Sequence, residues 1–113
     1  MTNIINLTPH AITFFSTGYG VETTYPSEGL ARVASKPGSQ IDGPFFSAPT
    51  WGEVEGLPAP QEGTVFVVSA LVAARCIGRA DVFSPGTGPA DGAIRDEKGQ
   101  IKAVTRFIQA PQA

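Results

Sequence analysis

Glycine and proline recur along the whole chain and interrupt it before any long helix or strand can form. The 113 residues include 13 Gly and 10 Pro, and their spacing follows no period. Both residues favour turns, because glycine adopts backbone conformations that other residues avoid and proline lacks a backbone donor. The sequence therefore predicts short elements joined by many turns, which is typical of strand-rich domains.

The rest of the composition indicates that these elements pack around one core. Hydrophobic residues make up 42% of the chain and charged residues 16%, a balance that favours a packed interior over disorder. A chain of this length is the usual size of one domain and can fold without a disulfide or a structural metal. We predict a single domain over residues 1–108 and a flexible C-terminal tail over residues 109–113.

Charge, cysteine content and hydropathy exclude several classes of protein. The net charge of −2 does not provide the broad basic field that binding of bulk nucleic acid requires. Cys76 is the single cysteine and lies in an apolar stretch, which predicts a buried, unreactive thiol and no intramolecular disulfide. The sequence has no signal-peptide pattern, and no apolar run approaches the roughly 18 residues of a transmembrane helix. We therefore expect a cytoplasmic protein with neither a membrane nor a bulk nucleic-acid partner.

Short runs of β-branched and aromatic residues predict that most of the fold consists of strands. The clearest run is Val65–Val68, whose continuous apolar character predicts a central strand that is covered on both faces. Other strands are expected at residues 3–7, 11–15, 21–25 and 30–34, with extended pieces near 45–46 and 51–54 and a closing hairpin of 93–95 and 101–108. Residues 84–92 are expected to form a loop.

One short helix is predicted directly after the central strand. Ser69 is a suitable N-cap, residues 70–77 would form about two turns, and Gly78 provides a left-handed stop. The predicted fold class is therefore mainly β (α+β). It consists of a small antiparallel sheet, or a partly open barrel or sandwich, with one short helix laid against it.

No sequence motif assigns a reaction, a metal or a cofactor. A nucleophile elbow of the Gly-x-Ser-x-Gly type is not present, and one His and one Cys among scattered acids do not predict a metal site. The loop Pro85–Pro89 is rich in glycine but lacks the Gly-Lys-Ser/Thr ending of a phosphate loop, which favours a plain surface loop. We therefore expect no metal and no cofactor.

Arginine and histidine are the candidates for binding chemistry. The arginines come from well-separated elements: Arg32, Arg75, Arg79, Arg95 and Arg106. The planar guanidinium suits phosphate and carboxylate groups, whereas the alternative is an ordinary surface ion pair for each, such as Arg79 with Asp81. His10 is the only histidine and follows Pro9 at a predicted corner. An imidazole there can bind a ligand or transfer a proton, although a lone histidine is more often structural.

Aromatic side chains leave two interpretations open. They occur singly at Tyr19, Tyr25 and Trp51 and in pairs at Phe14-Phe15 and Phe45-Phe46. Aromatic rings stack on bases in binding sites, but aromatic residues at these spacings are more often part of the core.

Four segments carry a resemblance to a family. They are Asn6–Ile12, with the sequence Asn-Leu-Thr-Pro-His-Ala-Ile, then Gly52–Pro58, Arg79–Val82 and Arg95–Gly99. In this order they resemble short uncharacterised proteins encoded by bacteriophages, prophages and some bacterial genomes that begin with Asn-Leu-Thr-Pro-His. The resemblance implies a phage setting, in which small proteins without catalytic motifs often work by binding, including capture of host nucleotide immune signals. It supplies no mechanism.

Three functions follow as hypotheses. The first is a binding protein for a small anionic ligand such as a nucleotide, with His10, Arg32, Arg79 and Arg95 as donors. The second is a structural or interaction protein, either a virion component or an inhibitor of a host protein. The third is a phosphodiester-type hydrolase that uses His10 as general acid or base. The sequence favours binding over catalysis, and unpaired edge strands lead us to expect a homo-oligomer.

Overall fold

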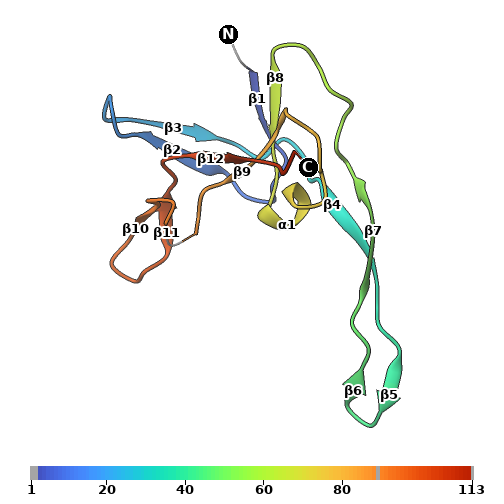
Figure 1. Cartoon of the computed structure of the whole chain (residues 1–113). Helices are drawn as coiled ribbons and strands as arrows, with labels where there is room; N and C mark the ends of the chain where they lie inside the picture. The colour runs from blue at the N-terminus through green and yellow to red at the C-terminus, as the bar shows by residue number, and fades with distance from the viewer. Residues whose placement is uncertain (1–2, 89, 113) are drawn as a thin grey trace.

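Four strands form the central sheet of the structure. The computed structural model describes residues 3–88 and 90–112. The strands are β1 (Asn3–Asn6), β8 (Thr64–Val67), β9 (Val82–Pro85) and β12 (Phe107–Gln109), in the order β1-β8-β9-β12 (Figure 1). β1 runs parallel to β8 and β8 parallel to β9, whereas β12 is antiparallel to β9. The central sheet is therefore mixed, whereas the sequence predicted antiparallel pairing.

The predicted fold class is confirmed. The described chain is mainly β, with one short helix and no closed barrel. The sequence analysis did not predict β9, because residues 84–92 were expected to form a loop, and it did not predict the short β5 strand (Gln40–Asp42). Two features hide β9: its last residue is Pro85, and one of its two buried positions, Ser84, is polar, so the apolar alternation stops after Val82.

The core lies on one face of this sheet. Phe66 of β8 and Val68, which follows β8, are fully buried. β8 lies between β1 and β9 in the sheet, so the prediction of a central strand at residues 65–68 is confirmed. The buried apolar side chains that pack together are Leu7, Ala31, Phe66, Val68, Val72, Ala73, Cys76, Val82 and Ala110. Val33, Val54 and Leu57 pack against this cluster from outside the sheet. Removal of this apolar surface from water is the main favourable term in folding.

The single helix of the described chain, α1 (Ala70–Ala73), is shorter than predicted. Its N-cap is Ser69, as predicted, and the Ser69 hydroxyl accepts a hydrogen bond from the Val72 amide at 3.3 Å. After Ala74 the amides of Arg75 and Cys76 bond three residues back, as from Cys76 to the Ala73 carbonyl at 3.0 Å, so the helix tightens into turns. Gly78 adopts the predicted left-handed conformation at φ 88°. Within residues 3–88 and 90–112, no helix is long and apolar enough to cross a membrane.

Two antiparallel hairpins flank the sheet. β2 (Ile12–Ser16) and β3 (Val21–Tyr25) lie where the sequence predicted strands, and they pair with each other. β10 (Ile94–Arg95) pairs with β11 (Ile101–Ala103), but the predicted strand over residues 101–108 is wrong in extent. Two separate strands, β11 and β12, occupy this range, because residues 107–109 pair with β9 in the central sheet.

The C-terminal segment packs against the core, so the predicted flexible tail from residue 109 is wrong over its described part. Gln109 is the last residue of β12, and Ala110 is buried. The Gly78 amide donates to the carbonyl of Pro111 at 2.8 Å, and the side chain of Gln112 donates to the Arg79 carbonyl at 3.3 Å. This polar segment is held in place because it exchanges hydrogen bonds with the backbone of Gly78 and Arg79, which supply one donor and one acceptor. Ala113 lies outside the described residues.

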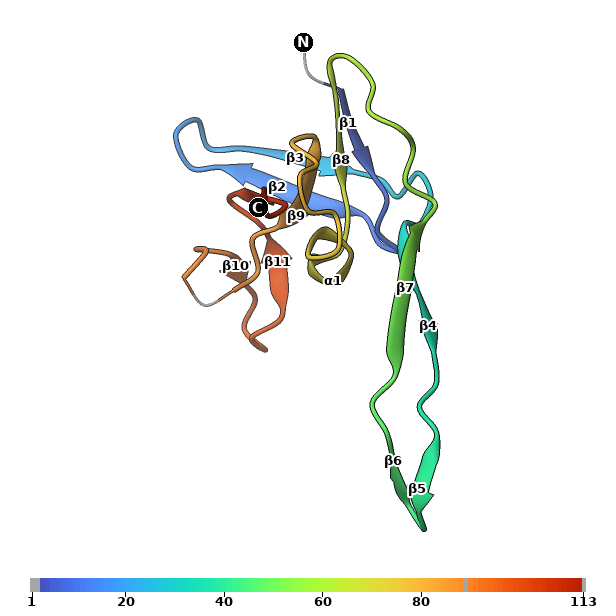
Figure 2. The same ribbon diagram turned by 45° about the vertical axis from the view of Figure 1, so that its right-hand side comes forward.

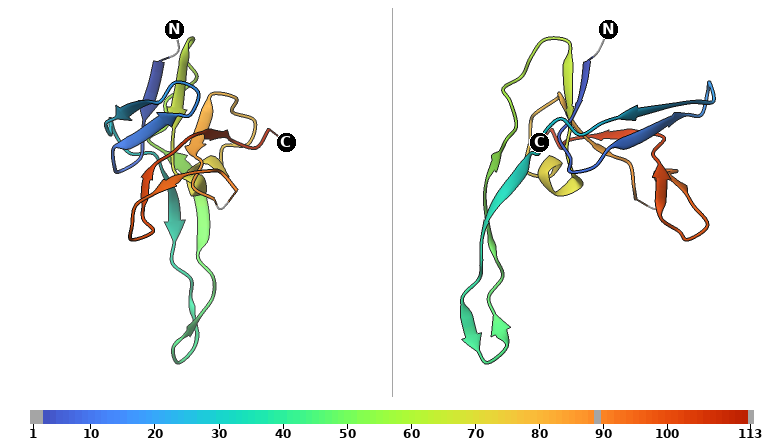
Figure 3. Two further views of the ribbon diagram at one scale, coloured as in Figure 1. Left: turned by 90° about the vertical axis from the view of Figure 1, so that its left-hand side faces the viewer. Right: turned by 180° about the vertical axis from the view of Figure 1, so that it is seen from behind.

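A long two-stranded arm leaves the core, as Figures 1 and 2 show. Its stem pairs β4 (Arg32–Lys36) with β7 (Thr50–Glu55), and its far end pairs β5 (Gln40–Asp42) with β6 (Phe45–Phe46). Both views of Figure 3 show this end far from the central sheet. The radius of gyration is 16.3 Å, above the roughly 13 Å of a globular domain of this length, because of the arm.

Candidate functional site

A cavity opens where three parallel strands end. β1, β8 and β9 run in the same direction, so the segments that follow them meet at one edge of the sheet. These segments contribute His10, Ser69 and Thr87 to a cavity of about 400 Å³. In open sheets the crevice beyond the carboxyl ends of parallel strands is a favoured position for ligands. The volume lies within the ~300–1,000 Å³ range of small-molecule sites.

The lining of this cavity combines apolar walls with positive charge and hydroxyl groups. Its polar side chains are Thr8, His10, Thr13, Ser69, Thr87 and Lys102. The walls are Ala11, Ile12, Ala70, Pro85, Ile101, Ala103 and Val104. No Asp or Glu is among the described residues that line it. The cavity therefore presents an imidazole, an ammonium group and hydroxyls, with no carboxylate to repel an anion.

Asn6 fixes the corner that carries His10. Its side chain is fully buried, and its amide nitrogen donates to the carbonyls of His10 and Tyr25, each at 2.9 Å. Its oxygen accepts from the backbone amide and the hydroxyl of Thr8 at 2.9 and 2.7 Å. The buried side chain thus replaces a backbone turn and holds the chain from Thr8 to His10 in one conformation. His10 itself is exposed at the rim of the cavity.

Asp91 holds the glycine-rich loop that brings Thr87 to the same cavity. The Asp91 carboxylate accepts a hydrogen bond from the Gly88 amide at 2.9 Å, and the Gly86 amide donates to the Arg106 carbonyl at 2.9 Å. A Cβ at Gly86 would lie 2.7 Å from the Arg106 side chain, so glycine is required for this close approach. Pro89 lies outside the described residues. The loop is thus a wall of the cavity, in contrast to the plain surface loop that the sequence predicted.

The structure does not bring His10, Arg32, Arg79 and Arg95 into one site. Arg32 lies on the arm stem, where its guanidinium pairs with Glu55 at 3.2 Å and both side chains are largely exposed. Arg79 lies beside a different cavity, which Arg75 and Cys76 also line. The four residues therefore occupy separate places in the fold, and only His10 lines the cavity at the strand ends.

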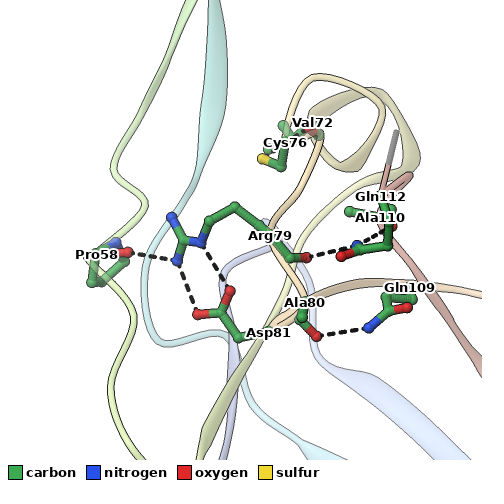
Figure 4. Close-up of polar contacts among 9 residues, drawn as sticks. All are labelled: Pro58, Val72, Cys76, Arg79, Ala80, Asp81, Gln109, Ala110 and Gln112. Carbon is green, nitrogen blue, oxygen red and sulfur yellow. Dashed lines mark hydrogen bonds and ion pairs between the residues drawn. The ribbon is translucent and has the colours of Figure 1, made fainter.

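Arg79 makes structural contacts with its own turn and with two other segments of the chain, through Asp81, Pro58 and Gln112 (Figure 4). Its Nε and Nη2 atoms contact the two carboxylate oxygens of Asp81 at 2.8 and 2.9 Å, and Nη2 also donates to the Pro58 carbonyl at 3.1 Å. Its own carbonyl accepts from Gln112. The ion pair raises the pKa of Arg79 and lowers the pKa of Asp81, chiefly through the hydrogen bond between the two side chains. The alternative interpretation of Arg79, an ion pair with Asp81, is therefore the one that the structure shows.

Substitution of Asp81 by asparagine should change how stability depends on pH. Because Arg79 lowers the folded-state pKa of Asp81, its stabilising contribution is complete above the unfolded-state pKa and is lost as pH falls through the folded value. We expect Asp81→Asn to lower the free energy of unfolding by about 1 kcal/mol at neutral pH, and by progressively less below about pH 4. Urea unfolding at a series of pH values tests this. Glu62→Gln, an exposed acid, is the control; a constant difference at all pH values would contradict the prediction.

Arg95 lies close to the cavity without lining it. Its guanidinium donates to the carbonyl of Gly99 at 2.8 Å and to that of Thr87 at 3.5 Å. Lys102 lines both the cavity at the strand ends and the neighbouring one that contains Arg95. Arg95 thus supports the β10–β11 hairpin beside the site.

Sequence reasoning did not single out Lys102, Ser69 and Thr87 as residues that line the cavity. Ser69 was assigned only a capping role, and Lys102 stands in a strand with no motif around it. The one available signal was positional: polar residues directly follow the predicted apolar strands at Thr8 and Ser69. It becomes informative only when the strands are known to be parallel neighbours.

The remaining candidates fall outside this cavity. Cys76 is buried, its thiol donates to the Val72 carbonyl at 3.2 Å, and burial raises its pKa, which fits the predicted unreactive thiol. Phe14 stacks on Phe107 with ring centroids 5.6 Å apart. Phe45 and Phe46, in contrast, are exposed on the arm, so the expectation of a core position is wrong for this pair.

The geometry defines a mixed-sheet β protein with a cationic cavity at the carboxyl ends of its parallel strands. Comparison of the chain with models of protein families, with curated protein sequences and with solved structures finds no match in any of the three.

Proposed function

We propose that this protein binds a small anionic ligand in the cavity at the strand ends. The observation that carries the proposal is the lining: His10 supplies an imidazole donor and Lys102 an ammonium group, hydroxyls surround them, and no described lining residue is acidic. Charge-assisted hydrogen bonds to an anion are about twice as strong as neutral ones. The proposal keeps His10 from the sequence prediction and replaces the three arginines with Lys102, Ser69 and Thr87.

The walls favour a ligand that has an apolar or planar body beside its anionic group. Ile12, Ile101 and Val104 supply apolar surface, and the cavity of about 400 Å³ is large enough for such a molecule. Nucleotides combine a planar base with phosphate and fit this description. In the phage setting that the sequence resemblance implies, capture of a host nucleotide signal is the role that this chemistry would serve.

Thermal unfolding of the purified protein against a panel of ligands tests the proposal. The panel contains cyclic and linear nucleotides, ADP-ribose-type compounds, inorganic phosphate and simple carboxylates. A ligand that binds only the folded state at about 100 times its Kd adds roughly 2.7 kcal/mol, which corresponds to a rise in Tm of about 10 °C for a chain of this size. Absence of any shift across the panel, at concentrations well above physiological ones, would contradict the proposal.

Single substitutions then locate the site. We expect His10→Gln and Lys102→Gln each to weaken binding of the ligand found in the panel by about 10-fold or more, because each removes a charge-assisted contact of roughly 1.5–3 kcal/mol. Isothermal titration calorimetry measures the effect. Arg32→Gln is the matched control: it removes a predicted donor that lies on the arm. An equal loss of affinity for Arg32→Gln would contradict the cavity as the binding site and would favour the donors that the sequence predicted.

The same titrations separate binding from the hydrolase hypothesis. A phosphodiester hydrolase would use His10 as general acid or base, and its ligand would be converted during a long incubation. A binding protein returns the ligand intact. Analysis of the recovered ligand by mass spectrometry therefore decides between the two.

A further inference from the structure

Aspartate is followed by glycine at two places in the chain, and the fold treats the two places differently. Asp42-Gly43 begins the turn between β5 and β6 at the far end of the arm. Asp91-Gly92 lies at the glycine-rich loop beside the cavity. Both glycines adopt left-handed backbone conformations, at φ 51° and 72°. The two sites therefore match in sequence and in glycine conformation, and they differ in the contacts that hold them.

An Asp-Gly sequence carries an intrinsic reaction. The glycine nitrogen attacks Cγ of the aspartate and forms an N–Cγ bond, and one carboxyl oxygen leaves as water with the amide proton and a proton from solvent. Water then opens this cyclic succinimide and the solvent proton is returned. Cleavage of the N–Cγ bond restores aspartate, whereas cleavage between the nitrogen and the main-chain carbonyl carbon leaves isoaspartate. The net change is an isomerisation without any reagent, and glycine favours it because no Cβ hinders its nitrogen.

Hydrogen bonds restrain Asp91-Gly92 on both sides of the reacting atoms. The Asp91 carboxylate accepts from the Gly88 amide at 2.9 Å, so it is engaged with a different part of the backbone. The Thr105 hydroxyl lies 3.2 Å from the Asp91 carbonyl oxygen and 3.1 Å from the Gly92 carbonyl oxygen. Ring closure requires the carboxyl group and the peptide group between Asp91 and Gly92 to turn toward each other. These bonds must break for that rotation, which raises the barrier.

Asp42-Gly43 lacks restraints of this kind. Both residues are exposed, and the Asp42 carboxylate makes no hydrogen bond or ion pair with residues 3–88 or 90–112. The one side-chain bond of the turn joins the Gln40 amide group to the Gly43 carbonyl at 2.9 Å, and it is exposed to water. Apart from its chain neighbours, no described atom lies within 4 Å of the position that a Cβ on Gly43 would take. The reacting carboxyl group and nitrogen therefore have open space around them.

We propose that Asp42 is a site of spontaneous isoaspartate formation in the folded protein and that Asp91 is protected from the same reaction. Isoaspartate adds one methylene to the main chain. At Asp42 the addition falls in the turn that sets the pairing of β5 with β6, where Asp42 lies opposite Phe45. The reaction therefore alters the far end of the arm, which Figures 1 and 3 show away from the central sheet. The loop that Asp91 holds beside the cavity stays intact.

Peptide mapping of aged protein tests the proposal. The full-length protein is incubated at neutral pH and physiological temperature, and electron-transfer fragmentation of its peptides distinguishes isoaspartate from aspartate. We expect isoaspartate to accumulate at Asp42 at least about 10-fold faster than at Asp91, equivalent to about 1.4 kcal/mol in the barrier. The control is the same chain unfolded in guanidinium chloride, in which the two rates should become similar. Equal rates in the folded protein, or the same difference in the unfolded chain, would overturn the proposal.

Two variants separate the reaction from other damage. Asp42→Glu keeps the negative charge and should abolish the signal in the arm, because the larger ring that glutamate would close forms far more slowly. Thr105→Val removes the hydroxyl that holds the carbonyls of Asp91 and Gly92, and it should raise the rate at Asp91 by about 10-fold without changing the rate at Asp42.

Circular dichroism checks that each variant is folded. An unchanged signal in Asp42→Glu, or an unchanged rate at Asp91 in folded Thr105→Val, would contradict the proposal. If Thr105→Val does not fold, the comparison of the folded and unfolded wild-type chain still decides. Ligand binding at the strand ends is measured separately, and its outcome does not bear on this reaction.

Discussion

Replacement of Asn6 by alanine is expected to lower the free energy of unfolding by about 3 kcal/mol and to disrupt the cavity. The substitution removes the hydrogen bonds of Asn6 to the carbonyls of His10 and Tyr25 and to the amide and hydroxyl of Thr8. Each buried polar group left without a partner costs about 1–3 kcal/mol, and water can reach the partly buried carbonyls, so the sum is smaller than the number of bonds suggests. Urea denaturation measures the change.

The position of Asn6 makes this effect both functional and structural. The same bonds hold the corner from Thr8 to His10, so we expect Asn6→Ala to weaken ligand binding even at temperatures where the variant remains folded. Hydrogen exchange at the Thr8 amide should become faster for the same reason. Asn3→Ala, at the exposed start of β1, is the control. A variant that loses less than about 1 kcal/mol and keeps full affinity would show that the corner does not depend on Asn6.

Replacement of Phe66 by alanine is expected to cost about 3–5 kcal/mol, the range measured for buried aromatic residues cut back to alanine. Phe66 is fully buried on the central strand and belongs to the core cluster, so its removal leaves a cavity that the short surrounding strands cannot easily fill. Typical domains have only 5–15 kcal/mol of stability. The variant should therefore unfold at a much lower urea concentration, or not fold at all.

Phe46 provides the matched control for Phe66. It is the same residue type on a strand, but it is 60% exposed at the far end of the arm. We expect Phe46→Ala to change the free energy of unfolding by less than about 0.5 kcal/mol. Similar losses for Phe46→Ala and Phe66→Ala would mean that Phe46 is buried in the folded protein, which would contradict the arm described above.

Local features of the fold could be predicted because they depend on neighbouring residues. The continuous apolar run of Val65–Val68 predicted a central strand, and Ser69 predicted the start of the helix, whereas the helix ends at Ala73, before the predicted stop at Gly78. The strands that form β2 and β3 followed from two runs separated by a glycine-containing turn. In each case the deciding interactions lie within a few residues along the chain.

The site was predicted less well, because it depends on which strands are neighbours. His10 was singled out as the only histidine, and it is among the residues that line the cavity. Arg32 and Arg79 were chosen for their chemistry, but ion pairs with Glu55 and Asp81 already engage them. A side chain's chemistry shows what it can bind, whereas its partners in the fold determine whether it is free to do so.

By itself, the sequence determined a mainly β chain of short elements that glycine and proline interrupt, because backbone conformational preferences are local. Only the tertiary structure decided that β1, β8 and β9 run parallel, that Lys102 joins His10 at one edge, and that Phe45 and Phe46 are exposed on an arm. Strand pairing and burial join residues far apart along the chain. Their energies come from contacts that no local pattern of residue types specifies.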